Sequence, residues 1–91
     1  MSSCSIFQVS MTEKEREKKE KLKLQKQFGV HLRQLREEKG LRASELSKRC
    51  FMERSNIARL ETGRVNPTLF MLKKLAAGLD MTMSELINGL K

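Results

Sequence analysis

Residues 42–63 decide the fold, and they read RASELSKRCFMERSNIARLETG. The first part predicts a short helix over residues 42–50, because the apolar residues Leu46 and Cys50 recur at helical spacing. The second part predicts another helix over residues 53–61, with its apolar residues on one side. Only a few residues lie between the two segments, so the sequence predicts two short helices joined by a tight turn.

The flanking sequence predicts three further helices and no strand. Apolar residues at helical spacing predict a helix over residues 24–39, which ends at Gly40, a residue suited to a left-handed cap. Thr68 is a natural N-cap for a fourth helix, and the stretch 82–85 is a capping box that opens a fifth. The apolar positions of these helices are Leu24, Phe28, Leu32 and Leu35, then Leu69, Leu72, Leu75, Ala76 and Leu79, then Leu86, Ile87 and Leu90. The expected fold class is therefore all-α, with five helices that include a helix-turn-helix.

The composition describes one small, basic domain. The chain has 91 residues, with 19 Lys and Arg against 11 Asp and Glu, for a formal net charge of +8. A chain of this size holds a single compact core. Its longest apolar runs, such as residues 75–79, are far shorter than a membrane span, and residues 1–10 lack the features of a secretory signal. We therefore expect a cytoplasmic protein that does not associate with membranes.

Cysteine and histidine are too few to suggest catalysis or metal binding. Cys4 and Cys50 are far apart in a chain that we expect to be cytoplasmic, so a disulfide between them is not expected. His31 is the single histidine, and no second ligand stands near it at zinc-binding spacing. Cys50 also lacks a neighbouring base that would activate it as a nucleophile. The sequence predicts a protein that is not an enzyme and that uses no cofactor, metal or small-molecule substrate.

The chain divides into a charged N-terminal extension, residues 1–24, and a helical domain, residues 25–91. The extension is expected to be flexible or partly helical, and Thr12 is well placed to cap a helix there. The stretch 13–26 contains seven basic and four acidic side chains. Its charge is compatible with a solvated surface, with a basic arm that contacts nucleic acid, or with docking of a partner protein through residues 12–26.

From Phe28 to Leu86 the sequence carries a set of motifs in a specific order: Leu32, Leu35 and Arg36, EEKGL at 37–41, EL at 45–46, IARLETG at 57–63, NP at 66–67, then Leu72, Leu75, Ala76, Leu79 and EL at 85–86. This order resembles the Xre/Cro-type helix-turn-helix family, the DNA-binding domain of phage repressors and of many small bacterial regulators. The resemblance implies a five-helix, lambda-repressor-like DNA-binding domain.

The sequence departs from that family at two positions. The turn position that is usually a glycine is Phe51, and the small residue that usually faces the recognition helix is Ser47. Phe51 adopts a left-handed turn less readily than glycine. We therefore expect the angle between the two central helices to differ slightly from the family's.

The predicted third helix has an outward face suited to reading DNA bases. Several polar and small side chains lie off the apolar stripe of Ile57 and Leu60. Arginine on such a face can donate two parallel hydrogen bonds to O6 and N7 of guanine. For any single residue, an ordinary solvated side chain is the alternative. The residues implied to contact bases are Arg54, Ser55, Asn56, Ala58 and Arg59.

The resemblance also implies phosphate contacts and an internal ion pair. Cationic side chains and the free backbone N–H groups at helix starts bind phosphates and set the register on DNA without reading its sequence. In relatives, the residues that match Arg36 and Glu61 form a partly buried salt bridge between the first and third helices. The implied phosphate-contacting residues are Arg36, Arg42, Ala43, Thr62 and Arg64.

A single domain of this kind contacts about half of a typical operator, so a homodimer on a two-fold site is expected. Phe70 lies outside the predicted core stripe of the fourth helix. With Met83 and Leu90 it forms a candidate apolar patch for that dimer, and ordinary surface apolarity is the alternative.

The residues and the resemblance together predict a sequence-specific regulator of bacterial transcription that binds double-stranded DNA, as a repressor or autoregulator. The alternative is a protein-interaction module of the same fold, such as an antitoxin-like or coactivator-type adaptor. Arg54 and Arg59 favour the regulator, because a protein adaptor has no evident need for two outward arginines on that helix.

Overall fold

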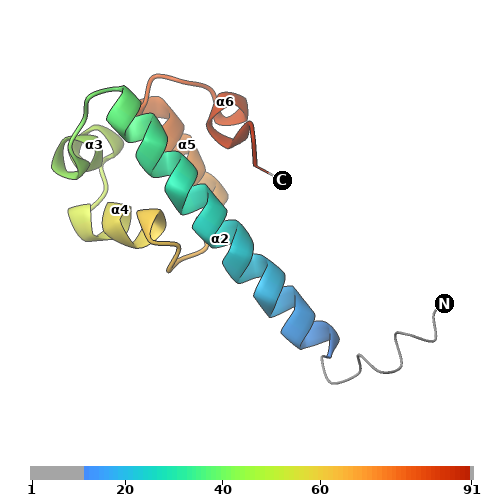
Figure 1. Ribbon diagram of the computed structural model, residues 1–91. Helices are drawn as coiled ribbons and strands as arrows, with labels where there is room; N and C mark the ends of the chain where they lie inside the picture. The colour runs from blue at the N-terminus through green and yellow to red at the C-terminus, as the bar shows by residue number, and fades with distance from the viewer. Residues whose placement is uncertain (1–11, 91) are drawn as a thin grey trace.

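A computed structural model describes residues 12–90, and the elements within that range are all helices. They are α2 (Glu13–Glu38), α3 (Ala43–Cys50), α4 (Arg54–Glu61), α5 (Leu69–Gly78) and α6 (Met83–Ile87). Figure 1 shows the four shorter helices gathered against the C-terminal half of α2. The predicted all-α class is confirmed, and the described part of the chain contains the five helices that were expected.

The helix predicted over residues 24–39 and the partial helix expected in the extension form one continuous helix, α2, which begins at Glu13 after the expected cap at Thr12. A capping box starts it: the Glu15 amide donates to Thr12 Oγ1 over 3.1 Å, and the Thr12 amide donates to Glu15 Oε1 over 2.8 Å. Neither glycine nor proline interrupts the next stretch, which consists largely of Lys, Glu, Arg, Leu and Gln. These residues have high helix propensity, so the helix persists where few apolar residues are present to reveal it.

The core lies between the C-terminal half of α2 and the other four helices. Its buried apolar residues are Phe28, Leu32, Leu46, Cys50, Ile57, Leu60, Leu75, Ala76, Leu79 and Leu86. All of them lie on helix faces that the sequence predicts to be apolar.

Two leucines that were predicted to face the core are exposed instead. Leu69 is 74% exposed and Leu24 is 46% exposed. Helical spacing identifies the face of a helix, but it does not reveal where neighbouring elements stop covering that face. Next to Leu24, the buried position on α2 is occupied by Gln25, whose Nε2 donates to the Gly63 carbonyl over 3.0 Å.

Helices α2 and α4 approach each other closely at Gly29. A Cβ atom at that position would lie 2.6 Å from the carbonyl oxygen of Leu60 and 2.5 Å from that of Glu61. Only glycine leaves room for the two backbones at this distance. The contact fixes the C-terminal turn of α4 against the middle of α2.

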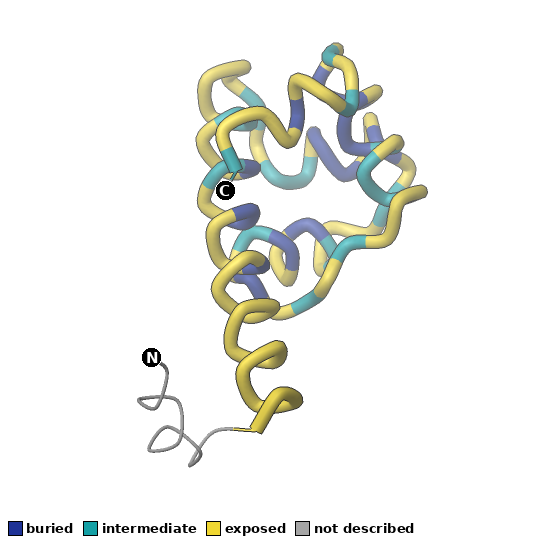
Figure 2. The backbone as a smooth tube through the Cα atoms, turned by 90° about the vertical axis from the view of Figure 1, so that its right-hand side faces the viewer, coloured by how far each residue is buried: buried dark blue, intermediate teal, exposed yellow. Residues whose placement is uncertain are grey.

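Residues 13–24 of α2, here called the overhang, extend beyond the packed body of the domain. Every residue of the overhang is exposed, and Figure 2 shows this part of the helix standing clear of the remaining elements. The molecule is correspondingly elongated, with principal extents of 51 × 23 × 21 Å. Among residues 12–90, no helix combines the length and apolar content that crossing a bilayer requires.

Candidate nucleic-acid interface

The N-terminus of α3 is capped through its backbone. Arg42 occupies the N-cap position but its side chain makes no capping hydrogen bond. Instead, the Arg42 amide donates to Glu45 Oε1 over 2.7 Å. As the first residue of the helix, Ala43 has an amide without an intrahelical acceptor. This helix start therefore presents a cationic residue and a free N–H group, as a phosphate site requires.

The turn between α3 and α4 is built on Phe51, which adopts the left-handed conformation at φ 56° and ψ 45°. The Met52 amide donates to the Ser47 carbonyl over 2.9 Å, and Lys74 Nζ from α5 donates to the Phe51 carbonyl over 3.0 Å. These contacts hold the turn although it lacks the usual glycine. The ring of Phe51 is 86% exposed and contributes little to the core.

Helix α4 has two distinct faces. Ile57 and Leu60 are fully buried against the rest of the domain. The opposite face is solvent-exposed and carries four of the five residues predicted to contact bases, namely Arg54, Ser55, Ala58 and Arg59. The fifth, Asn56, is half-buried and accepts a hydrogen bond at Oδ1 from Arg59 Nη1 over 3.2 Å.

An ion pair between Arg36 and Glu61 joins α2 to the end of α4. Arg36 Nε donates to Glu61 Oε2 over 2.6 Å, Nη2 donates to Oε1 over 3.1 Å, and Nη1 donates to the Leu41 carbonyl over 2.9 Å. The hydrogen bond to the Glu61 carboxylate raises the pKa of Arg36 above its ordinary value. The Arg36 and Glu61 side chains are only 12% and 10% exposed, so the guanidinium is committed to the interior of the domain.

The other residues predicted to contact phosphates lie at the two ends of the α3–α4 unit. Arg42 and Ala43 stand at the start of α3, and Thr62 and Arg64 follow the end of α4. Arg42, Thr62 and Arg64 are exposed, whereas Ala43 is half-buried. The Thr62 hydroxyl donates to the Ala58 carbonyl over 2.9 Å and lies 3.2 Å from that of Arg59. It must therefore rotate away from α4 before it can donate to a phosphate.

Comparison with known proteins identifies the family to which these packed helices belong. The sequence model of the helix-turn-helix domain family matches residues 27–86. The chain belongs to this family. The helix-turn-helix domain is of the Xre/Cro type that the motifs indicated, a family of DNA-binding transcription regulators that are not enzymes. The overhang lies outside the matched residues.

Similar proteins carry related descriptions. The HTH-type transcriptional regulator DdrOP3 of Deinococcus deserti is 35% identical over 60 residues, which cover 66% of this chain but only 46% of that protein. Control protein C.MunI of a Mycoplasma species is 35% identical over 69 residues, covering 70% of this chain and 88% of its own. The restriction-modification controller protein C.AhdI of Aeromonas hydrophila has a solved structure that superposes with a TM-score of 0.66 and 37% identity, covering 68% of this chain and 94% of that one.

The packing of the helix-turn-helix domain also depends on two residues outside the predicted site. Gly29 permits the close approach of α2 and α4, and Gln25 links α2 to the loop that follows α4. A glycine inside an otherwise strong helical pattern lowers helix stability, so its presence is a signal of close packing. A glutamine on the apolar face of a helix signals a buried polar contact, and Gln25 makes such a contact with Gly63.

The candidate dimer patch is less uniform than predicted. Phe70 is 67% exposed, with Lys74 Nζ 5.4 Å from the centre of its ring. Met83 and Leu90 are half-buried and pack against the core, and Leu90 lies beside Phe28 and Val30 of α2, so Phe70 is the one exposed member of the three predicted residues. Leu69 and Ile87 are the additional exposed apolar residues of α5 and α6.

Cys50 is a structural residue of the core. It is 1% exposed and contacts Gly78 of α5, and burial raises the pKa of its thiol. Within residues 12–90, no group of three His, Cys, Asp or Glu side chains is arranged to hold a metal ion. Cys4 lies outside the described residues.

Proposed function

We propose that this protein is a transcription regulator that reads a specific DNA sequence with α4 in the major groove. The observation that carries the proposal is the outward face of α4, where two arginines, a serine and an alanine are exposed on a helix whose opposite side is buried. The dimensions of the major groove admit an α-helix, and the first residues of a recognition helix are those that reach base edges.

The side chains of this face suit direct base readout. Arg54, in the first turn, can bind guanine through O6 and N7, and Ser55 can bond to any of several base edges. Ala58 offers a methyl group to thymine. The hydrogen bond from Arg59 to Asn56 orients the guanidinium before DNA binds, which lowers the entropic cost of the contact.

Residues suited to contact phosphates stand at both ends of the α3–α4 unit, which favours the same pose. We assign these contacts to Arg42, the Ala43 amide, Thr62 and Arg64, which flank the proposed reading helix. We assign Arg36 a structural role, because its guanidinium is held by Glu61 and Leu41. The buried pair keeps α4 at a fixed position relative to α2.

We further propose that the regulator binds as a homodimer, through the apolar patch centred on Phe70. Two copies related by a two-fold axis contact two half-sites about one helical turn apart. Occupying a promoter in this way would repress transcription, including that of its own gene. This activity requires access to chromosomal DNA, so we propose a cytoplasmic location.

Selection of bound duplexes from a random DNA pool, at roughly physiological salt, tests the proposal. We expect convergence on a two-fold symmetric motif. Arg54→Ala should then lose about 1–3 kcal/mol of discrimination at one base pair of each half-site. Arg16→Ala, on the overhang, is the control and should leave the preferred sequence unchanged. A pool that does not converge would favour the protein-interaction adaptor.

A further inference from the structure

The overhang carries a row of lysines on one face. Lys21, Lys18 and Lys14 lie four, seven and eleven residues before Gln25, and this spacing keeps all four residues on one side of an α-helix. Gln25 itself contacts Gly63 at the end of α4. The lysine row therefore continues, past the edge of the body, the same face of α2 that packs on α4.

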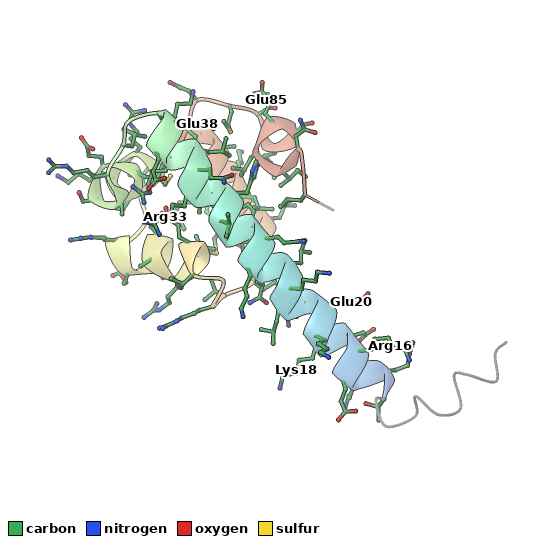
Figure 3. The ribbon with its side chains drawn as sticks, in the orientation of Figure 1. Arg16, Lys18, Glu20, Arg33, Glu38 and Glu85 are labelled. Carbon is green, nitrogen blue, oxygen red and sulfur yellow. The ribbon has the colours of Figure 1, made fainter. Side chains whose placement is uncertain are left out.

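The position of Lys18 agrees with this register. In Figure 3, Lys18 points to the side of α2 on which α4 lies, whereas Arg16 and Glu20 point to the other side. The outward face of α4 is turned away from α2, so DNA bound by that face lies beyond α4 on the same side as the lysine row. Gln25, one helical turn beyond Lys21, contacts Gly63, which adjoins two of the residues that we assign to phosphates, Thr62 and Arg64.

The chemistry of the row fits a phosphate backbone. All three lysines are exposed, and none forms an ion pair with a carboxylate within residues 12–90. The exposed apolar residues of the overhang are Leu22 and Leu24, which flank the row without belonging to it. The capping box at Thr12 and the uninterrupted helix hold the lysines in line with the body, so binding orders little additional chain.

We propose that Lys14, Lys18 and Lys21 form a second phosphate-binding surface, which follows the DNA backbone beside the groove that α4 enters. The proposal rests on the proposed function, since it places the duplex on the outward side of α4. It assigns the overhang, which lies outside the region matched by the family, the role of extending the footprint without reading bases.

Two variants with equal charge changes test the proposal. The first, Lys14→Gln, Lys18→Gln and Lys21→Gln, removes the row. The control, Arg16→Gln, Lys19→Gln and Lys23→Gln, removes three cations from the opposite face of the same helix. Glutamine retains high helix propensity, and circular dichroism checks that both variants keep the helical content of the parent.

Binding of the full chain to its selected duplex and to a random duplex is measured between about 50 and 200 mM salt. We expect the first variant to weaken binding to both duplexes by about tenfold or more, and to lower the slope of log K against log salt by about 1 for each lysine that contacts a phosphate. The control variant should change both quantities much less, and the preferred sequence should be the same for all three proteins.

Equal losses in the two variants would overturn the proposal, because they would reflect net charge and not a defined face. Unchanged binding by the first variant would also overturn it. The proposed function has a separate readout in this experiment: if Arg54→Ala still loses base discrimination, only the lysine row is refuted. Loss of a protein partner by the first variant, with DNA binding intact, would assign the overhang to protein docking. Absence of any duplex binding by the parent protein would refute both proposals.

Discussion

Phe51 holds a left-handed backbone conformation that glycine adopts without steric cost. The conformation costs an L-residue about 1–2 kcal/mol, part of which the greater freedom of glycine in the unfolded chain offsets. Because its ring is 86% exposed, little burial is lost on substitution. We predict that Phe51→Gly raises the free energy of unfolding by up to about 1 kcal/mol in urea titrations.

The control for this prediction is Phe51→Ala, which removes the ring but keeps the Cβ atom. It should leave the free energy of unfolding nearly unchanged. An equal gain in both variants would show that the exposed ring, and not the backbone, causes the penalty.

Glu61 neutralises a guanidinium that the fold has removed from water. Removing one partner of a buried pair leaves an uncompensated charge, so Glu61→Ala should lower the free energy of unfolding by about 3–5 kcal/mol. Glu37→Ala breaks the pair with Arg33, whose side chains are 64% and 55% exposed, and should cost less than about 1 kcal/mol. Thermal and urea unfolding measure the stability of both variants. A melting temperature for Glu61→Ala equal to that of the parent would contradict the assigned role.

One half of helix α2 can be predicted from the pattern of apolar residues, and the other half cannot. Its C-terminal half can be predicted because Phe28 and Leu32 are four residues apart, which places both apolar side chains on one face of a helix. Its N-terminal half has no such face, since it packs against no other element within residues 12–90, and only propensity and the cap at Thr12 signal it. Hydrophobic periodicity arises when one face of a helix is buried, so it does not reveal a helix that is exposed on all sides.

The candidate site divides in the same way. Ile57 and Leu60 define the inner side of α4, so the outward position of Arg54 and Arg59 follows from their spacing alone. Gln25 and Gly29 stand out in the local pattern, but the element that each one contacts depends on how near α4 comes to α2, which the local pattern does not encode.

The contact at Gly29 makes the junction of α2 and α4 intolerant of a methyl group. We predict that Gly29→Ala lowers the free energy of unfolding by about 1–3 kcal/mol, although alanine is the better helix former, because the backbone atoms of Leu60 and Glu61 cannot move aside independently. Val30→Ala, at a 57% exposed position of the same helix, should have a small effect in the same urea titration. A stabilised Gly29→Ala protein would show that the helices are farther apart.

The proposed dimer places an exposed aromatic residue, Phe70, at its interface. A lysine at the centre of an apolar interface must be desolvated, so Phe70→Lys should raise the dimer dissociation constant by at least about tenfold. Sedimentation equilibrium measures this, with Leu22→Lys, at a 45% exposed position on the overhang, as the control. If the two variants and the parent sediment alike, Phe70 is not at the interface.

The overhang also governs how the molecule moves through solution. A compact chain of this length has a radius of gyration of about 12 Å, whereas that of this protein is 16.2 Å. An elongated particle experiences more friction than a sphere of equal mass. A monomer of 10.5 kDa will therefore elute early from a gel-filtration column, at a volume that imitates a larger assembly. Only a method that reports mass independently of shape can distinguish one copy from two.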